Sequence, residues 1–85
     1  ESIPLYEKTL EIRPDNVRVS FNLVDACRME KRFDEALAVC RQVAALGPQQ
    51  AKRAYRTMAG IYAEQGHQEK AAEADRMSES IPLAR

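Results

Sequence analysis

Two cysteines and one histidine are the side chains in this sequence whose chemistry suits redox or metal work. Cys27 and Cys40 do not form a Cys-x-x-Cys motif, and His67 lies much further along the chain. Because a structural zinc site needs about four ligands, these residues do not predict one. Buried thiols more often pack as small apolar groups than react, so we expect Cys27 and Cys40 to pack in a core. A disulfide or redox switch between them is the alternative.

Other sets of catalytic residues are not visible in the sequence. It contains no glycine-rich phosphate loop and no Ser/His/Asp set, and a single histidine leaves little general-base machinery near neutral pH. Acidic side chains do gather towards the end of the chain, but solvated helix surfaces explain them. These are Glu64, Glu69, Glu73 and Asp75. We therefore expect no enzymatic activity and no cofactor.

Lys52 and Arg56 are the best candidates for binding chemistry. They are four residues apart, which places both side chains on one face of a helix. Two cations on one face can contact a single anion, and each charge-assisted contact contributes about 1.5 to 3 kcal/mol. The pair predicts a site for a carboxylate or a similar anion.

The composition excludes several classes of partner. Lysine plus arginine number 13 and aspartate plus glutamate number 13, so no surplus charge attracts nucleic acid or an anionic membrane. No apolar run approaches the roughly 20 residues that span a bilayer, and no secretion signal opens the sequence. We expect no nucleic-acid partner, no membrane partner and a cytoplasmic location.

The elements that would position these residues are helices. Helix-forming residues dominate, β-branched residues never alternate over a useful length, and apolar residues recur at helical spacing. The expected inward faces are Ser20, Leu23, Val24 and Cys27, then Tyr55, Met58, Ala59 and Tyr62, then Ala71, Ala74, Met77 and Ile81. The fold class is all-α, with about five helices in a chain of this length.

Helix ends are also marked in the sequence. Asp15 or Asn16 can cap one helix at its start, and Asp34 can cap the next. Gly47 with Pro48 indicates the end of a helix, and Gly66 indicates another. The links between the expected helices are short, and short links force neighbouring helices to run antiparallel.

Prolines recur at Pro14, Pro48 and Pro82, so the interval is 34 residues both times. A fixed interval of this length indicates a structural repeat. The other marked positions of one repeat are Asn22-Leu23-Val24, Cys27, Phe33-Asp34-Glu35-Ala36, Cys40 and Val43. The pattern resembles the tetratricopeptide repeat, and this resemblance implies antiparallel helix pairs stacked as an α-solenoid.

The resemblance covers the chain as one helical-repeat unit over residues 1–85. It divides into the closing helix of a repeat (1–14), a full repeat (15–48) and a second full repeat (49–85). Ala36 and Ala71 lie 35 residues apart whereas the prolines lie 34 apart, so we expect one residue to be gained near Gln49 to Ala51 and lost again in the last helix. Lys31 stands where the family usually has a glycine between helices. Since Glu1 already lies in a helical pattern, we expect an excerpt of a longer array.

The resemblance also implies a binding surface, because the first helix of each repeat lines the inner groove in this family. The expected groove residues are Asn22, Lys52, Arg56, Arg18, Phe21, Asp25 and Arg53. Chaperone-binding members hold acidic tails with an Asn on one repeat and a Lys and an Arg on the next, and the spacing of Asn22, Lys52 and Arg56 is similar to this carboxylate clamp. The shift near Ala51 would rotate Lys52 and Arg56 by about 100° around the helix axis, which weakens the interpretation of these residues as a clamp.

The leading functional prediction is a protein-protein interaction scaffold that binds a partner protein or peptide in the concave groove. The alternative is a structural spacer or self-assembly segment that uses its open terminal helices. A carboxylate clamp of the co-chaperone type and an RNA-binding helical repeat of the pentatricopeptide type are less favoured, the latter because the net charge is zero.

Overall fold

The computed structural model describes residues 2–82, apart from the side chain of Ser2, and these residues form five helices and no strand. Residues 83–85, the end of the second predicted full repeat, lie outside the described part. The helices are α1 (Ser2–Ile12), α2 (Val17–Met29), α3 (Phe33–Ala44), α4 (Pro48–Glu64) and α5 (Gln68–Ser80). The predicted all-α class and the predicted number of helices are confirmed.

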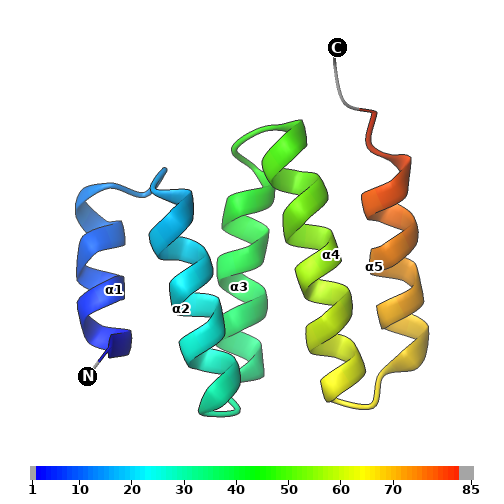
Figure 1. The fold of residues 1–85 in the computed structure, drawn as a ribbon, viewed down its shortest axis with the longest axis horizontal. Coiled ribbons are helices and arrows are strands. Elements are labelled where there is room, and N and C mark those ends of the chain that lie inside the picture. Colours follow the sequence, from blue (N-terminus) through cyan, green and yellow to red (C-terminus); the bar gives the residue numbers. More distant parts are fainter. Residues whose placement is uncertain (1, 83–85) are drawn as a thin grey trace.

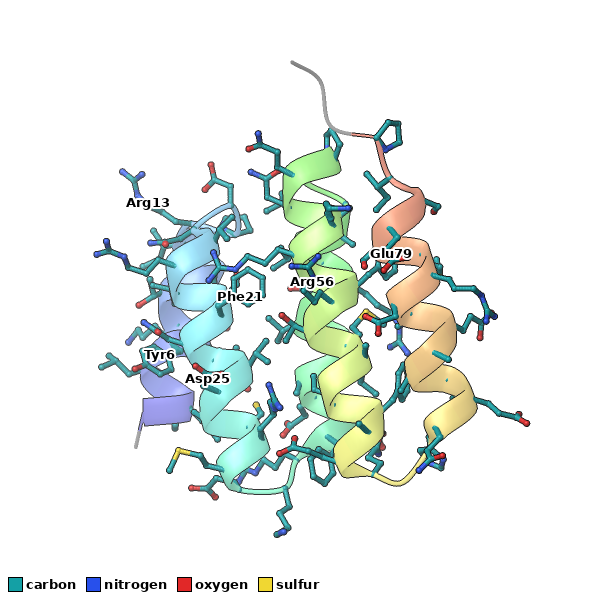
Figure 2. The ribbon with its side chains drawn as sticks, turned by 45° about the vertical axis from the view of Figure 1, so that its right-hand side comes forward. Tyr6, Arg13, Phe21, Asp25, Arg56 and Glu79 are labelled. Atoms are coloured by element: carbon teal, nitrogen blue, oxygen red, sulfur yellow. The ribbon has the colours of Figure 1, made fainter. Side chains whose placement is uncertain are left out.

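Consecutive helices run antiparallel and lie next to one another across the molecule (Figure 1). Each helix packs chiefly on the helices next to it in the sequence, as in a solenoid. Figure 2 shows that α2 and α4 form one layer, while α1 and α3 lie behind them. Because α2 and α4 are parallel, both helices begin at the same end of this layer.

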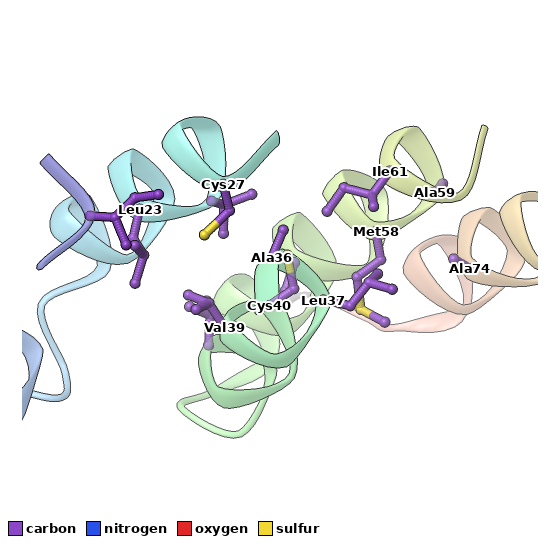
Figure 3. Close-up of a cluster of buried hydrophobic side chains, with 14 residues drawn as sticks. Leu23, Cys27, Ala36, Leu37, Val39, Cys40, Met58, Ala59, Ile61 and Ala74 are labelled. Atoms are coloured by element: carbon purple, nitrogen blue, oxygen red, sulfur yellow. The ribbon is translucent and has the colours of Figure 1, made fainter. Parts of the chain in front are cut away.

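The core runs through all five helices (Figure 3). Its most deeply buried side chains between α2 and α3 are small: Val24 and Cys27 on α2 and Ala36 and Cys40 on α3 are each at most 1% exposed. Small side chains allow the helix axes to approach closely. The close approach brings more atoms into dispersion contact, which compensates for the smaller apolar volume of these side chains. The inward face predicted for α2 is confirmed at every position.

The buried face of α4 differs from the predicted one. Ala54, Met58 and Ile61 are buried together with Ala59, whereas Tyr55 and Tyr62 are only half-buried. The residues that precede Ala54, Met58 and Ile61 by the 34-residue proline interval are Ser20, Val24 and Cys27. The predicted shift near Ala51 is therefore absent from α4. Alanine fits the closest approach of the helices, while each tyrosine keeps its hydroxyl near water.

The shift appears in α5 instead. Ala74 is buried as predicted, but Met77 is 41% exposed and Ser78, at 1%, takes its place. The Ser78 hydroxyl donates to a backbone carbonyl one turn earlier in α5, which makes its burial tolerable. Ile81 lies just beyond the helix as its C-cap and is half-buried.

The helix starts confirm one predicted cap and correct two other predictions. The Asn16 side chain accepts a hydrogen bond from the backbone N–H of Val19 at 3.2 Å and caps α2 as predicted. Asp34 does not cap α3; it lies in the first turn, where its negative charge favours the positive end of the helix. Pro48 begins α4 rather than ending α3, since a helix tolerates proline at its first position.

The turns after α2 and α4 share one hydrogen-bond pattern. In both turns a backbone N–H reaches back five residues, from Arg32 to the Cys27 carbonyl at 2.7 Å and from His67 to the Tyr62 carbonyl at 2.8 Å. This pattern requires a left-handed residue, which is Lys31 (φ 61°) in the first turn and Gly66 (φ 83°) in the second. Lys31 therefore adopts the conformation for which the family uses glycine, at a cost that glycine avoids.

Candidate functional site

The predicted groove residues lie on α2 and α4, which together form one layer of the molecule (Figure 2). We call this surface the α2–α4 face. On α2, Arg18, Asn22 and Asp25 follow one another at helical spacing and are all exposed, which leaves them available to a partner. The remaining members of the face are Phe21, Arg28, Lys52, Arg53, Arg56 and Glu64.

Arg53 and Phe21 connect the two helices near their starts. The guanidinium carbon of Arg53 lies 4.2 Å from the centre of the half-buried Phe21 ring. An arginine stacked on an aromatic ring gains a cation–π attraction and keeps its outer N–H groups free to bind an anion. Both residues were predicted to line the groove, and the structure brings them together.

Arg28 and Glu64 connect the same helices at their other ends. Arg28 Nε donates to Glu64 Oε1 at 2.9 Å, and the two side chains are 28% and 47% exposed. Sequence reasoning missed this contact. A signal was available in Gly60, because glycine is unfavourable inside a helix and often marks a close approach. A β-carbon at Gly60 would lie 3.5 Å from an Arg28 guanidinium nitrogen.

Lys52 points towards α5 rather than towards α2. Its Nζ donates to the Ser78 backbone carbonyl at 2.8 Å, in a partly buried position. This carbonyl belongs to the last turn of α5, where the helix has no partner of its own for it. Lys52 therefore contacts α5, whereas its neighbour Arg53 contacts α2.

Charge is distributed unevenly along the α2–α4 face. Arg18 lies in the first turn of α2 and Arg53 in the first half of α4, and Arg56 is the middle residue of α4. The first turns of α2 and α4 contain no acidic residue, and helix N-termini carry partial positive charge. At the opposite end, Glu64 neutralises Arg28. The face therefore has a positive end and a neutral end.

The cysteines are part of the core, as predicted. Cys27 and Cys40 are free thiols, 1% and 0% exposed. Burial raises the pKa of the Cys40 thiol to about 12, and it also raises the pKa of Cys27, with a further contribution from Glu35. Protonated thiols are poor nucleophiles and poor metal ligands. Within residues 2–82, no three His, Cys, Asp or Glu side chains gather where they could hold a metal ion.

Comparison with known proteins agrees with this architecture. The sequence model of one family, described as the tetratricopeptide repeat, matches residues 1–59. No curated protein and no solved structure matches the chain. Repeats of this family generally mediate protein–protein interactions, and the family is typically a non-catalytic scaffold. No helix among residues 2–82 is both long and apolar enough to cross a membrane. The chain belongs to the tetratricopeptide repeat family.

Proposed function

We propose that the chain is an interaction scaffold whose α2–α4 face binds an acidic segment of a partner protein. The observation that carries this proposal is the positive end of the face. Arg18 lies in the first turn of α2, Arg53 in the first half of α4 and Arg56 at the middle of α4. The acidic residue of α2 is Asp25.

The chemistry of these side chains suits carboxylates. A guanidinium can hold both oxygens of a carboxylate, and such charge-assisted bonds are about twice as strong as neutral ones. The Phe21 ring fixes the Arg53 side chain before binding, which reduces the entropy lost when a partner is bound. The half-buried ring also offers an apolar surface beside the cations.

The test is calorimetric titration of the 85-residue chain with a synthetic peptide that ends in several Asp and Glu residues. We expect binding that weakens at least about tenfold in the double variant Arg53→Ala with Arg56→Ala, since each contact contributes about 1.5 to 3 kcal/mol. A matched control replaces two exposed arginines on other helices, Arg41→Ala with Arg76→Ala. Equal losses in both double variants, or no binding at all, would contradict the proposal.

The carboxylate clamp assigns to Lys52 the part that we assign to Arg53. Single variants separate the two versions. Arg53→Ala should weaken binding of the acidic peptide more than Lys52→Ala does, because Lys52 already donates a hydrogen bond to the Ser78 carbonyl. The reverse order, with Lys52→Ala together with Arg56→Ala removing most of the affinity, would favour the clamp of Asn22, Lys52 and Arg56.

Self-assembly is the second candidate function, and α1 supplies the observation that favours it. Leu5 and Ile12 are 64% and 75% exposed and lie two turns apart on one stripe of the helix. Light scattering over a range of concentrations, with the double variant Leu5→Glu and Ile12→Glu, tests this. Tyr6 is a poor site for such a change, because it packs against the core and its loss would destabilise the fold. A constant monomer mass would exclude self-assembly.

A further inference from the structure

A hollow lies between α1 and α3, on the opposite side of α2 from the α2–α4 face. It encloses about 570 Å³. The buried side chains of Leu23 and Val39 line it, and the half-buried or exposed side chains of Leu10, Ala38 and Leu46 complete its apolar surface. We call it the α1–α3 groove. Its apolar lining and its size suit a few apolar side chains of a ligand.

Acidic side chains surround the α1–α3 groove. Glu7 and Glu11 lie one turn apart on α1, and Glu35 lies on α3; all three line the hollow and are exposed. Arg32 contacts Glu35 at 3.6 Å, and within residues 2–82 Glu7 and Glu11 form no ion pair. Burial is the main cause of the raised pKa of Cys27; Glu35 and Glu7 raise it further, and Arg32 lowers it. Among residues 2–82, none of the side chains that line the groove is basic.

We propose that the α1–α3 groove docks a short segment of a partner protein in which apolar side chains are flanked by lysine or arginine. The apolar side chains would cover Leu10, Val39 and Leu46, and the flanking cations would contact Glu7 and Glu11. This surface is separate from the α2–α4 face and has the opposite charge preference. The chain would then hold two partner segments at once, an acidic one on the α2–α4 face and a basic one behind it.

A second copy of the chain is the competing occupant, because the chain itself contains a segment of this kind. Met29 is 85% exposed and is flanked by Arg28, Lys31 and Arg32. Two of these cations are already engaged, Arg28 with Glu64 at 2.9 Å and Arg32 with Glu35 at 3.6 Å. Lys31 alone would remain to pair with Glu7 and Glu11, so charge complementarity favours a separate protein.

The experiment uses fluorescence anisotropy of the 85-residue chain with a labelled peptide in which leucines alternate with pairs of lysines. A control peptide carries glutamine in place of every lysine. We expect the lysine peptide to bind and the glutamine peptide to bind at least about tenfold more weakly, because the neutral peptide has no cations to contact the acidic side chains of the groove. Binding of the lysine peptide should weaken further as salt is added.

Two variants test the location. Glu7→Gln with Glu11→Gln removes two of the acidic charges that line the groove. We expect the lysine peptide to bind roughly 3- to 10-fold more weakly, because exposed contacts of this kind are weak. Ala38→Trp fills the groove from an exposed position and should abolish binding. The matched controls are Glu69→Gln with Glu79→Gln, and Ala72→Trp, all at exposed positions of α5. The controls should bind the lysine peptide like the original chain.

Three results would overturn the proposal. One is equal affinity for the lysine and glutamine peptides. Another is an unchanged affinity in both groove variants. The third is a dimer that light scattering detects in the original chain and that Ala38→Trp dissociates, since a second copy would then occupy the groove. Loss of acidic-peptide binding in the Arg53→Ala and Arg56→Ala variant leaves this proposal untouched, so the two can fail independently.

Discussion

Arg28 Nε and Glu64 Oε1 lie 2.9 Å apart and join the last turn of α2 to the last residue of α4. Arg53 stacked on Phe21 joins the same two helices near their first turns. The α2–α4 face is thus bridged at both ends by side chains from different repeats. These bridges connect the two helices whose exposed residues we propose to bind a partner.

The Arg28–Glu64 contact should contribute little to global stability. Both side chains are partly exposed, at 28% and 47%, and pairs of this kind contribute about 0.2 to 1 kcal/mol. A double-mutant cycle with Arg28→Ala and Glu64→Ala, measured by urea unfolding, should give a coupling energy in this range that shrinks in high salt. The Arg32–Glu35 pair, at 3.6 Å within one helical turn, should couple less. A coupling well above 1 kcal/mol would show that solvent screens the pair poorly.

Gly60→Ala should stabilise the protein. The added β-carbon would meet an Arg28 nitrogen at 3.5 Å, an ordinary contact distance, and alanine is about 1 kcal/mol better than glycine inside a helix. We expect a gain of about 0.5 to 1 kcal/mol in the free energy of unfolding.

Gly66→Ala is the matched control for that gain. Apart from Gly66 and its two chain neighbours, no atom of residues 2–82 lies within 4 Å of a β-carbon at Gly66, but its φ of 83° is unfavourable for alanine. The same substitution should therefore destabilise the protein here by about 1 kcal/mol, through the backbone alone. If both glycine variants shifted the unfolding midpoint in the same direction, the conformational explanation would be wrong.

Lys31→Gly should also stabilise, for the converse reason. Lys31 adopts φ 61°, a conformation that costs a non-glycine residue roughly 1 to 2 kcal/mol, and glycine loses part of this gain through its greater freedom when unfolded. The net expectation is about 0.5 to 1 kcal/mol. Lys31→Ala retains the strain and removes only the exposed side chain, so its unfolding midpoint should stay near that of the original chain. A glycine variant no more stable than the alanine variant would disprove strain at this turn.

Cys40 should make stability fall at alkaline pH. Its pKa is about 12 in the fold against a usual 9.0, so the folded state keeps a proton that the unfolded chain releases. Stability from this thiol is complete below pH 9 and declines as the pH rises from there towards 12, with a slope approaching about 1.4 kcal/mol per pH unit. Denaturant unfolding between about pH 8 and about pH 10 should show this slope in the original chain and a smaller one in Cys40→Ala. Equal slopes would contradict the assignment.

The fold was predictable because most of its determinants are local. The inward face of α2, the Asn16 cap and the end of a helix at Gly66 follow from spacing and residue type, and the structure confirms all three. Pro48 was misread for a physical reason. A proline after a glycine fits the end of one helix and the first position of the next equally well, and the residues up to Ala44 satisfy α3 without it.

The register of α4 and α5 depended on contacts that the sequence does not display. Tyr55 and Ala54 are adjacent, and periodicity favours the larger apolar residue, whereas the space between the helices accepts only the smaller one. Likewise, Met77 was preferred to Ser78 by hydropathy, although the Ser78 hydroxyl finds its partner within its own helix. For the candidate site, spacing identified the cations of α4 but not their directions. Lys52 turns to α5 because an unsatisfied carbonyl is within reach there.

Packing of each helix chiefly on its neighbours in the sequence has a consequence for how the chain folds. The connections between helices are short, so no long loop must close before apolar surface is buried. Chains with such local topology cross their folding barrier in microseconds to milliseconds, and nucleation can start at any helix pair. Ribosomal synthesis suits this order, because each helix from α2 to α5 can pack on the helix that emerged just before it.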